Sequence, residues 1–265
     1  MRCVLVAHAL VVVALLAAGC VSAPRVETAV APPSFSAGAL VESTRVVRAD
    51  DLVRAPGTIA TYAVLSGRRQ GATLEQRHDF SMNSPDGREL VISERMRKRP
   101  TDAWVDSERM SLTRSDDGLF ILREVATPEE DSLSRFDDGL AFAAPELESG
   151  ESLDGASTMT VRTLVAGKPR GTGEATRSLR IVGECDINLC GLPTRAIVLE
   201  LVFDVTLDVA TAHVVSQVYV VPGRGIVAEV RREDVRILGI IPRRRDETIV
   251  LVDFIAPNPY ATKVR

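Results

Sequence analysis

Apolar and polar residues alternate along residues 197–209, and this period of two constrains the fold more than any other feature of the chain. Every second position there is aliphatic or aromatic, whereas Glu200, Asp204, Thr206 and Asp208 stand between them. Successive side chains of a β-strand point to opposite faces, so the pattern predicts a long half-buried strand with one wet face. Shorter runs of the same period recur along the rest of the chain and predict further strands. Their apolar positions that share a face are Leu90 and Ile92, then Met159, Val161 and Val165, then Ala175, Leu179 and Ile181, then Ile226, Ala228 and Val230, and finally Ile249 and Leu251.

Four short segments rich in glycine, proline and aspartate separate the alternating runs. They are residues 84–87, 115–118, 167–171 and 222–225. Asp-Gly and Pro-Gly supply the backbone angles of tight turns, and strands joined by tight turns are antiparallel. A hydrophobic content of 45% is enough to form a core. The sequence therefore predicts a mainly β fold, a large curved antiparallel sheet or half-barrel of about ten strands with little helix.

The predicted strands define one domain over residues 57–255. An acidic stretch at residues 127–157 is expected to cross between two halves of this domain, which cover residues 57–126 and 158–255. Residues 256–265 are expected to form a C-terminal tail.

The N-terminus has the layout of a secretory signal. Arg2 is followed by a nearly continuous apolar run over residues 3–18, and small residues precede a cysteine. Leu-Ala-Ala-Gly-Cys at residues 16–20 resembles the bacterial lipobox, which implies that residues 1–19 are a signal peptide. The resemblance also implies lipid on Cys20, with a diacylglyceryl group on its sulfur and an acyl chain such as palmitate on its amine. An ordinary signal peptide and an uncleaved anchor are the alternatives.

The lipobox predicts an exported protein that lipid on Cys20 holds to a bacterial membrane. Val21 follows the cysteine where an aspartate would favour inner-membrane retention, so the periplasmic face of the outer membrane is expected if the cell is Gram-negative. Residues 20–56 contain several prolines and read as a lipidated tether, with one short helix expected within residues 38–54.

Two further cysteines, Cys185 and Cys190, lie close together in Glu-Cys-Asp-Ile-Asn-Leu-Cys-Gly. An oxidising compartment favours pairing, so a structural Cys185–Cys190 disulfide is expected. A redox pair usually has two intervening residues rather than four. A zinc site would need two more ligands, and none lies near in sequence.

The turn chemistry and alternation of residues 140–150 and 220–227, within residues 57–252, resemble a group of exported bacterial β-sheet proteins. These are similar in shape to the LolA/LolB lipoprotein carriers. The resemblance implies a curved sheet around an apolar hollow, and it carries over no functional residue.

Familiar catalytic patterns are missing from the sequence. His78 and His213 each lie in a strand-like stretch, where a satisfied strand histidine is expected rather than a base or ligand. Ser216 is three residues from His213, which places the two on opposite faces of a strand. The glycine-rich segment 167–173 reads as a turn rather than a phosphate site, because no helix is expected after it. The adjacent carboxylate pairs read as solvated turns, and no catalytic residue, metal site or cofactor is expected.

The net charge of −4 is spread over interspersed acidic and basic residues, so no nucleic-acid partner is expected. The leading hypothesis is a non-enzymatic cell-envelope lipoprotein that binds or carries a hydrophobic ligand. The alternatives are a non-catalytic scaffold for an envelope protein and, last, a hydrolase with an unrecognised site. A free sheet edge would favour the scaffold, and a pocket holding a perturbed carboxylate or histidine would favour the hydrolase.

Overall fold

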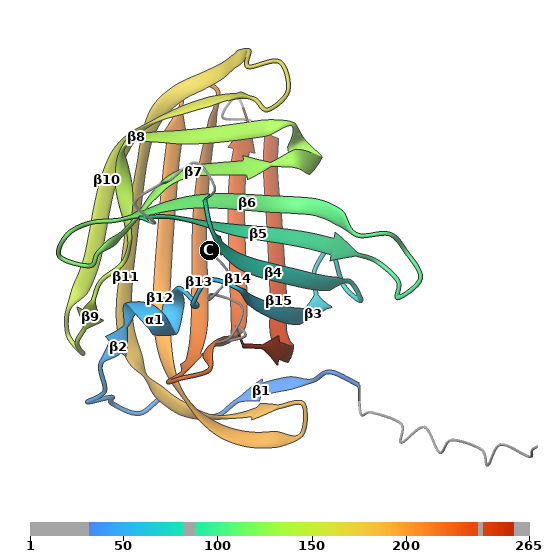
Figure 1. Ribbon diagram of the computed structural model, residues 1–265, viewed down its shortest axis with the longest axis vertical. Coiled ribbons are helices and arrows are strands. Elements are labelled where there is room, and N and C mark those ends of the chain that lie inside the picture. Colours follow the sequence, from blue (N-terminus) through green and yellow to red (C-terminus); the bar gives the residue numbers. More distant parts are fainter. Residues whose placement is uncertain (1–31, 82–87, 238–240, 257–265) are drawn as a thin grey trace, which may run out of the picture. The chain divides into compact units, whose positions relative to one another are not determined.

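The alternating segments are strands in the structure, a computed structural model that describes residues 32–81, 88–237 and 241–256. Twelve strands form one antiparallel sheet that closes into a barrel (Figure 1). Each pairs with the next along the chain, and the last, β15, pairs with the first, β3. The barrel strands are β3 (Thr58–Ser66), β4 (Thr73–Phe80), β5 (Glu89–Arg97), β6 (Val105–Arg114), β7 (Phe120–Thr127), β8 (Ser132–Ala143), β10 (Ser152–Thr163), β11 (Pro169–Leu189), β12 (Leu192–Leu207), β13 (Ala210–Val221), β14 (Gly225–Ile237) and β15 (Ile241–Ile255).

The predicted mainly β, curved antiparallel architecture is confirmed, and the sheet closes. The predicted turns at residues 115–118, 167–171 and 222–225 fall at the connections β6–β7, β10–β11 and β13–β14. The turn predicted at residues 84–87 lies outside the described residues, as do the signal peptide and Cys20.

The acidic stretch at residues 127–157 is part of the barrel wall rather than a crossing between two halves. It contains the short helix η1 (Pro128–Glu130), all of β8, the two-residue strand β9 (Glu146–Leu147) and the start of β10. The carboxylates of β8, Asp137 and Asp138, are exposed, whereas Phe136 and Leu140 beside them face inward and are 3% and 0% exposed.

Residues 35–53, expected to belong to a free tether, fold onto the barrel. β1 (Phe35–Ala37) pairs with the end of β11, and β2 (Val47–Arg48) pairs with β9. The helix α1 (Ala49–Leu52) is one turn long and contacts β13 and β14. Within the described ranges, no helix has the length and apolarity that a membrane crossing requires.

The start of β12 and the end of β13 are apolar on both faces. Leu199 pairs with Val218 and belongs to the inner cluster, whereas Val198 pairs with Tyr219 and belongs to a second cluster. Phe35 of β1 covers this second cluster from outside, with its ring centroid 4.9 Å from that of Tyr219. The start of the long alternating segment therefore lies between an outer apolar layer and the barrel interior, whereas Asp204 and Thr206 further along β12 form the predicted wet face.

A β-bulge in β11 changes which of its side chains face the barrel interior and which face the second cluster, outside the barrel. The pairing register shifts between Ile181 and Gly183, so that the following residues present the opposite parity of side chains. Gly183 has φ +151°, and a Cβ there would lie 2.5 Å from the carbonyl oxygen of Val41. Beyond the bulge, Cys185 belongs to the outer cluster and is 1% exposed.

The predicted Cys185–Cys190 disulfide is wrong for this structure, because both residues are free thiols. Cys185 lies within β11 and Cys190 follows its last residue, so an extended strand separates them. Five residues at about 3.3 Å each place the two Cα atoms roughly 16 Å apart. A disulfide requires a Cα separation below about 7 Å.

Candidate functional site

A cavity of about 710 Å³ lies inside the barrel. Leu52 and Arg54 line it at the end that carries the β13–β14 turn. This end is the floor, because α1 sits there and Asp51 accepts a hydrogen bond of 3.0 Å from the backbone N–H of Gly223. Arg68 and Glu130, both exposed, line the cavity at the opposite end, which is its mouth.

One side of the cavity is apolar and the other is polar. Strands β8 and β11–β13 supply the apolar side, which consists of Phe142, Leu179, Leu201 and Val218. Strands β4–β6, β14 and β15 supply the polar side, which includes Gln76, His78, Glu94, Ser107, Glu108, Glu229, Arg231, Arg245 and Glu247. Ile92, Met110, Ile226 and Ile249 add apolar surface on those same strands. The lining is thus amphipathic and differs from the apolar hollow that the family resemblance implies.

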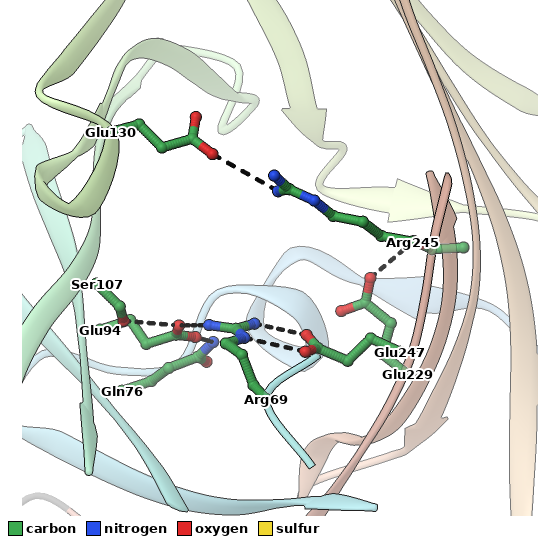
Figure 2. A network of polar contacts seen from close by, with 9 residues as sticks. Arg69, Gln76, Glu94, Ser107, Glu130, Glu229, Arg245 and Glu247 are labelled. Carbon is green, nitrogen blue, oxygen red and sulfur yellow. Dashed lines mark hydrogen bonds and ion pairs between the residues drawn. The ribbon is translucent and has the colours of Figure 1, made fainter. Parts of the chain in front are cut away.

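Arg69 organises the polar side by binding two carboxylates from different strands (Figure 2). Its guanidinium donates to both carboxylate oxygens of Glu247, at 2.9 and 2.5 Å, and to Glu94 at 3.2 Å. Gln76 and Ser107 donate to the same Glu94 carboxylate at 3.1 and 2.9 Å. The hydrogen bonds that Arg69 donates to Glu247 raise the pKa of Arg69, which therefore stays charged.

A β-bulge in β6 places two consecutive side chains in the cavity. Glu94 pairs with Glu108 and Arg95 pairs with Asp106, so Ser107 is the extra residue. Both Ser107 and Glu108 line the cavity. Burial, reinforced by the nearby Glu94 carboxylate, raises the pKa of Glu108 to about 7. Glu108 is therefore largely protonated at mildly acidic pH, while Glu94 is held by three donors.

Glu229 and Arg231 continue the polar side along β14. Ser216 donates to Glu229 at 2.7 Å. Burial lowers the pKa of Arg231, but the carboxylates of Glu229 and Glu108 outweigh it and the net shift is upward. The Nε of Arg231 is buried and has no hydrogen-bond partner among the described residues.

Across the mouth, Arg245 of β15 reaches toward Glu130 in η1, 3.5 Å between the charged groups (Figure 2). The Arg245 side chain is 35% exposed and that of Glu130 is 55% exposed, so solvent reaches this pair. An exposed pair of this kind contributes little to stability and leaves the mouth free to adjust.

Two polar side chains at the floor have contrasting surroundings. Arg54 is 6% exposed and donates to the carbonyl oxygens of Arg224 and Ile226, at 2.6 and 2.7 Å, and to the hydroxyl of Tyr62 at 3.1 Å. His78 is 3% exposed, and neither ring nitrogen has a hydrogen-bond partner among the described residues. Burial, together with the charge of Arg54, lowers the pKa of His78 to about 4. The expectation of a satisfied strand histidine is wrong for His78.

Arg177 is the one charged side chain that β11 contributes to the apolar side, and it is 7% exposed. It donates to the carbonyl oxygen of Ala141 at 2.7 Å and stacks on the ring of Phe142, 4.8 Å from the centroid. No ion pair with a described carboxylate compensates its charge. Burial alone lowers its pKa to about 10, so the guanidinium remains cationic at neutral pH.

The remaining candidates from the sequence do not form a site. His213 is exposed on the outer face and lies 2.6 Å from Asp204, whereas Ser216 is 1% exposed and points to the inner face, where it donates to Glu229. Their predicted placement on opposite faces is confirmed. Asp116 and Asp117 are exposed in a turn, as expected. In the described part of the chain, no three His, Cys, Asp or Glu side chains are grouped to hold a metal ion.

Sequence reasoning missed the charged cavity lining, although a signal for part of it exists. Glu94 has the same parity as Leu90, Ile92 and Met96 in β5, and Arg177 has the same parity as Leu179 in β11. A charge at a position where alternation requires an apolar residue marks an interior polar site.

No family model, no curated protein and no solved structure matches the chain.

Proposed function

We propose that this chain is a non-enzymatic binding protein that carries a small amphipathic molecule inside its barrel. The observation that carries the proposal is the two-sided lining of a cavity of about 710 Å³. A volume of roughly 300–1,000 Å³ is typical of small-molecule sites. A core that only stabilised the barrel would be apolar throughout, because buried charges and unpaired polar atoms cost free energy.

The buried polar atoms of His78 support a ligand with hydrogen-bonding groups. Its two ring nitrogens are buried beside the cavity and have no hydrogen-bond partner in the described part of the chain. A neutral imidazole offers one donor and one acceptor that point away from each other, so a hydroxyl or amide group of a ligand could pair with one of the two nitrogens. The leading hypothesis of a purely hydrophobic ligand is thereby narrowed to a ligand with an apolar face and a polar face.

The proposal places the carrier in the cell envelope, with lipid on Cys20. The folded unit begins at Pro32, so residues 21–31 would link it to the lipid. Eleven residues reach at most about 40 Å when fully extended. The Cys20→Ala variant should leave the membrane fraction of fractionated cells, and an equal membrane content in both proteins would contradict the anchor.

Dye binding to the full chain tests whether the cavity takes up an apolar molecule. N-phenyl-1-naphthylamine is neutral, and its fluorescence rises when it leaves water. The substitution Leu201→Trp adds bulk to the cavity, whereas Val202→Trp adds the same bulk to the other face of β12. We expect the dye to bind the wild type and Val202→Trp but to bind Leu201→Trp at least tenfold more weakly. Equal binding by both variants would place the dye elsewhere and remove the support for a carrier.

A hydrolase is the second candidate function, because the cavity holds a perturbed carboxylate. Glu94 and Glu108 stand directly opposite each other on paired strands, which puts their Cβ atoms about 5 Å apart. One protonated and one ionised carboxyl group at such a spacing could act as an acid and a base on a glycosidic bond. Hydrolysis of nitrophenyl glycosides that is lost in Glu108→Gln and retained in Glu174→Gln, an exposed control, would favour this function over the carrier.

The scaffold alternative has less support. Each of the twelve barrel strands has a partner on both sides within the described residues, so the barrel wall offers no free edge for β-augmentation.

A further inference from the structure

Among the described residues, four arginines line the buried part of the cavity, and Arg177 differs from the other three because it has neither a nearby carboxylate nor a full set of acceptors. Arg69 binds two carboxylates, Arg54 donates to three oxygens, and Arg231 lies in the field of Glu229 and Glu108.

Within residues 32–81, 88–237 and 241–256, Arg177 makes a single hydrogen bond, to the carbonyl oxygen of Ala141. A guanidinium has five N–H donors, so most of its donors are not used by protein groups. A buried charge without a partner is unfavourable, and an acid group of a ligand would compensate it.

The surroundings of Arg177 define the rest of that ligand. Its guanidinium stacks on Phe142, and Leu179 follows it on the same face of β11. Leu201 pairs with Leu179 on β12, and both line the cavity. A guanidinium surrounded by apolar side chains matches a ligand whose acid group is attached directly to an aliphatic chain.

The remainder of the cavity limits the charge of the acid. More carboxylates than arginines line it, including Glu94, Glu108, Glu229 and Glu247. A dianion such as a phosphate monoester would be repelled by them and would find only one uncompensated guanidinium. A carboxylate carries one charge, and its two oxygens match the fork of one guanidinium.

We infer that the ligand of this barrel is an aliphatic monocarboxylate, whose acid group pairs with Arg177 and whose chain lies along Phe142, Leu179 and Leu201. This inference rests on the proposed carrier function and adds the head-group chemistry.

Isothermal titration of the full chain with three twelve-carbon probes tests the inference. Dodecanoate is an anion, 1-dodecanol is neutral and dodecylamine is a cation, while the aliphatic chain is the same. Each is used below its aggregation concentration. We expect the wild type to bind dodecanoate about tenfold or more tightly than dodecanol, since a charge-assisted pair is worth roughly a factor of ten. Dodecylamine should bind more weakly than dodecanol near Arg177.

Two substitutions of Arg177 separate a binding role from a structural one. Arg177→Met keeps the length and apolar bulk but removes the charge, and it should bind dodecanoate and dodecanol equally. Arg177→Lys keeps the charge without the fork and should retain part of the preference. Thermal melting establishes that each variant is folded, and if Arg177→Met does not fold, the lysine variant and the three-probe comparison on the wild type still decide.

The outcomes distinguish the inference from the function on which it rests. Equal binding of dodecanoate and dodecanol by the wild type, or an unchanged preference in Arg177→Met, would overturn the carboxylate assignment and leave the carrier standing. If dodecylamine bound most tightly of the three probes, the glutamates rather than Arg177 would bind the head group, and the carboxylate assignment would also be overturned. Binding of none of the probes would remove the aliphatic carrier and the inference together.

Discussion

Glu108 is the residue whose ionisation should govern stability at neutral and alkaline pH. Its pKa rises from 4.5 to about 7 because the cavity buries it near Glu94. The folded state holds the proton more tightly than the unfolded state, so its contribution is complete below pH 4.5 and is lost as pH rises through 7. Since the side chain is only partly buried, we discount the full shift and expect a loss of about 2 kcal/mol.

The substitution Glu108→Gln removes this ionisation and should stabilise the protein by about 2 kcal/mol at pH 8 while changing little at pH 4. Urea unfolding at the two pH values measures the difference. The same change at Glu174, which is exposed on β11, should have no such pH dependence. Parallel stability curves for Glu108→Gln and the wild type would mean that Glu108 ionises freely in the folded barrel.

His78 should lower the stability of the folded protein at acidic pH. Its pKa falls from 6.5 to about 4, so the unfolded chain takes up a proton that the folded chain refuses. The contribution of neutral His78 to the free energy of unfolding is complete above pH 6.5 and is lost as the pH falls toward 4. His78→Phe should therefore gain about 2 kcal/mol more at pH 4.5 than at pH 8. Thermal melts across this range provide the measurement, and a gain independent of pH would show that only packing had changed.

At the scale of elements, the strands and turns were predictable because their signals are local. Alternation marked Ala175, Leu179 and Ile181 as one buried face of β11, and this is what the structure contains. Bulges are not visible in alternation, however. Ile226, Ala228 and Val230 were expected on one face, but a register shift in the β13–β14 pairing sends Ile226 into the cavity and Ala228 to the outer cluster.

The bulge in β11 makes a prediction that compares two glycines of one strand. Gly183 has a positive φ and no room for a Cβ beside Val41, whereas a Cβ at Gly171 would make ordinary contacts of 3.7 Å or more. Gly183→Ala should destabilise the protein by about 1–3 kcal/mol, because both the backbone and the β11 contact with residue 41 are strained. Gly171→Ala should be within about 0.5 kcal/mol of the wild type. Chemical denaturation of both variants tests this, and equal midpoints would mean that the bulge relaxes without cost.

At the scale of the whole molecule, closure of the barrel was beyond sequence reasoning. It depends on the pairing of β15 with β3, which joins the last and first barrel strands, and no local pattern encodes such a distant partner. The segment 35–53 was misread for the same reason. Its prolines and weak periodicity are typical of a tether, and its burial follows only from the presence of the barrel end that it covers.

Arg54 should decide whether the floor of the barrel stays closed. Its guanidinium joins the segment after α1 to the β13–β14 turn and to Tyr62 of β3. Arg54→Met would leave the carbonyl oxygen of Arg224 without this donor and would remove one of the two donors of the Ile226 carbonyl oxygen, which should cost about 2 kcal/mol. The matched control is Arg224→Met, since Arg224 is exposed and only its backbone oxygen takes part.

Hydrogen exchange followed by mass spectrometry separates loss of the floor from general unfolding. In Arg54→Met, the amides of residues 43–54 should exchange at least tenfold faster, while β12 and β13 keep their protection because each stays paired with a strand on both sides. Faster exchange throughout the barrel would mean instead that the floor and the wall unfold as one unit. Unchanged exchange at residues 43–54 would show that the apolar contacts of Val47, Leu52 and Val53 hold the floor without Arg54.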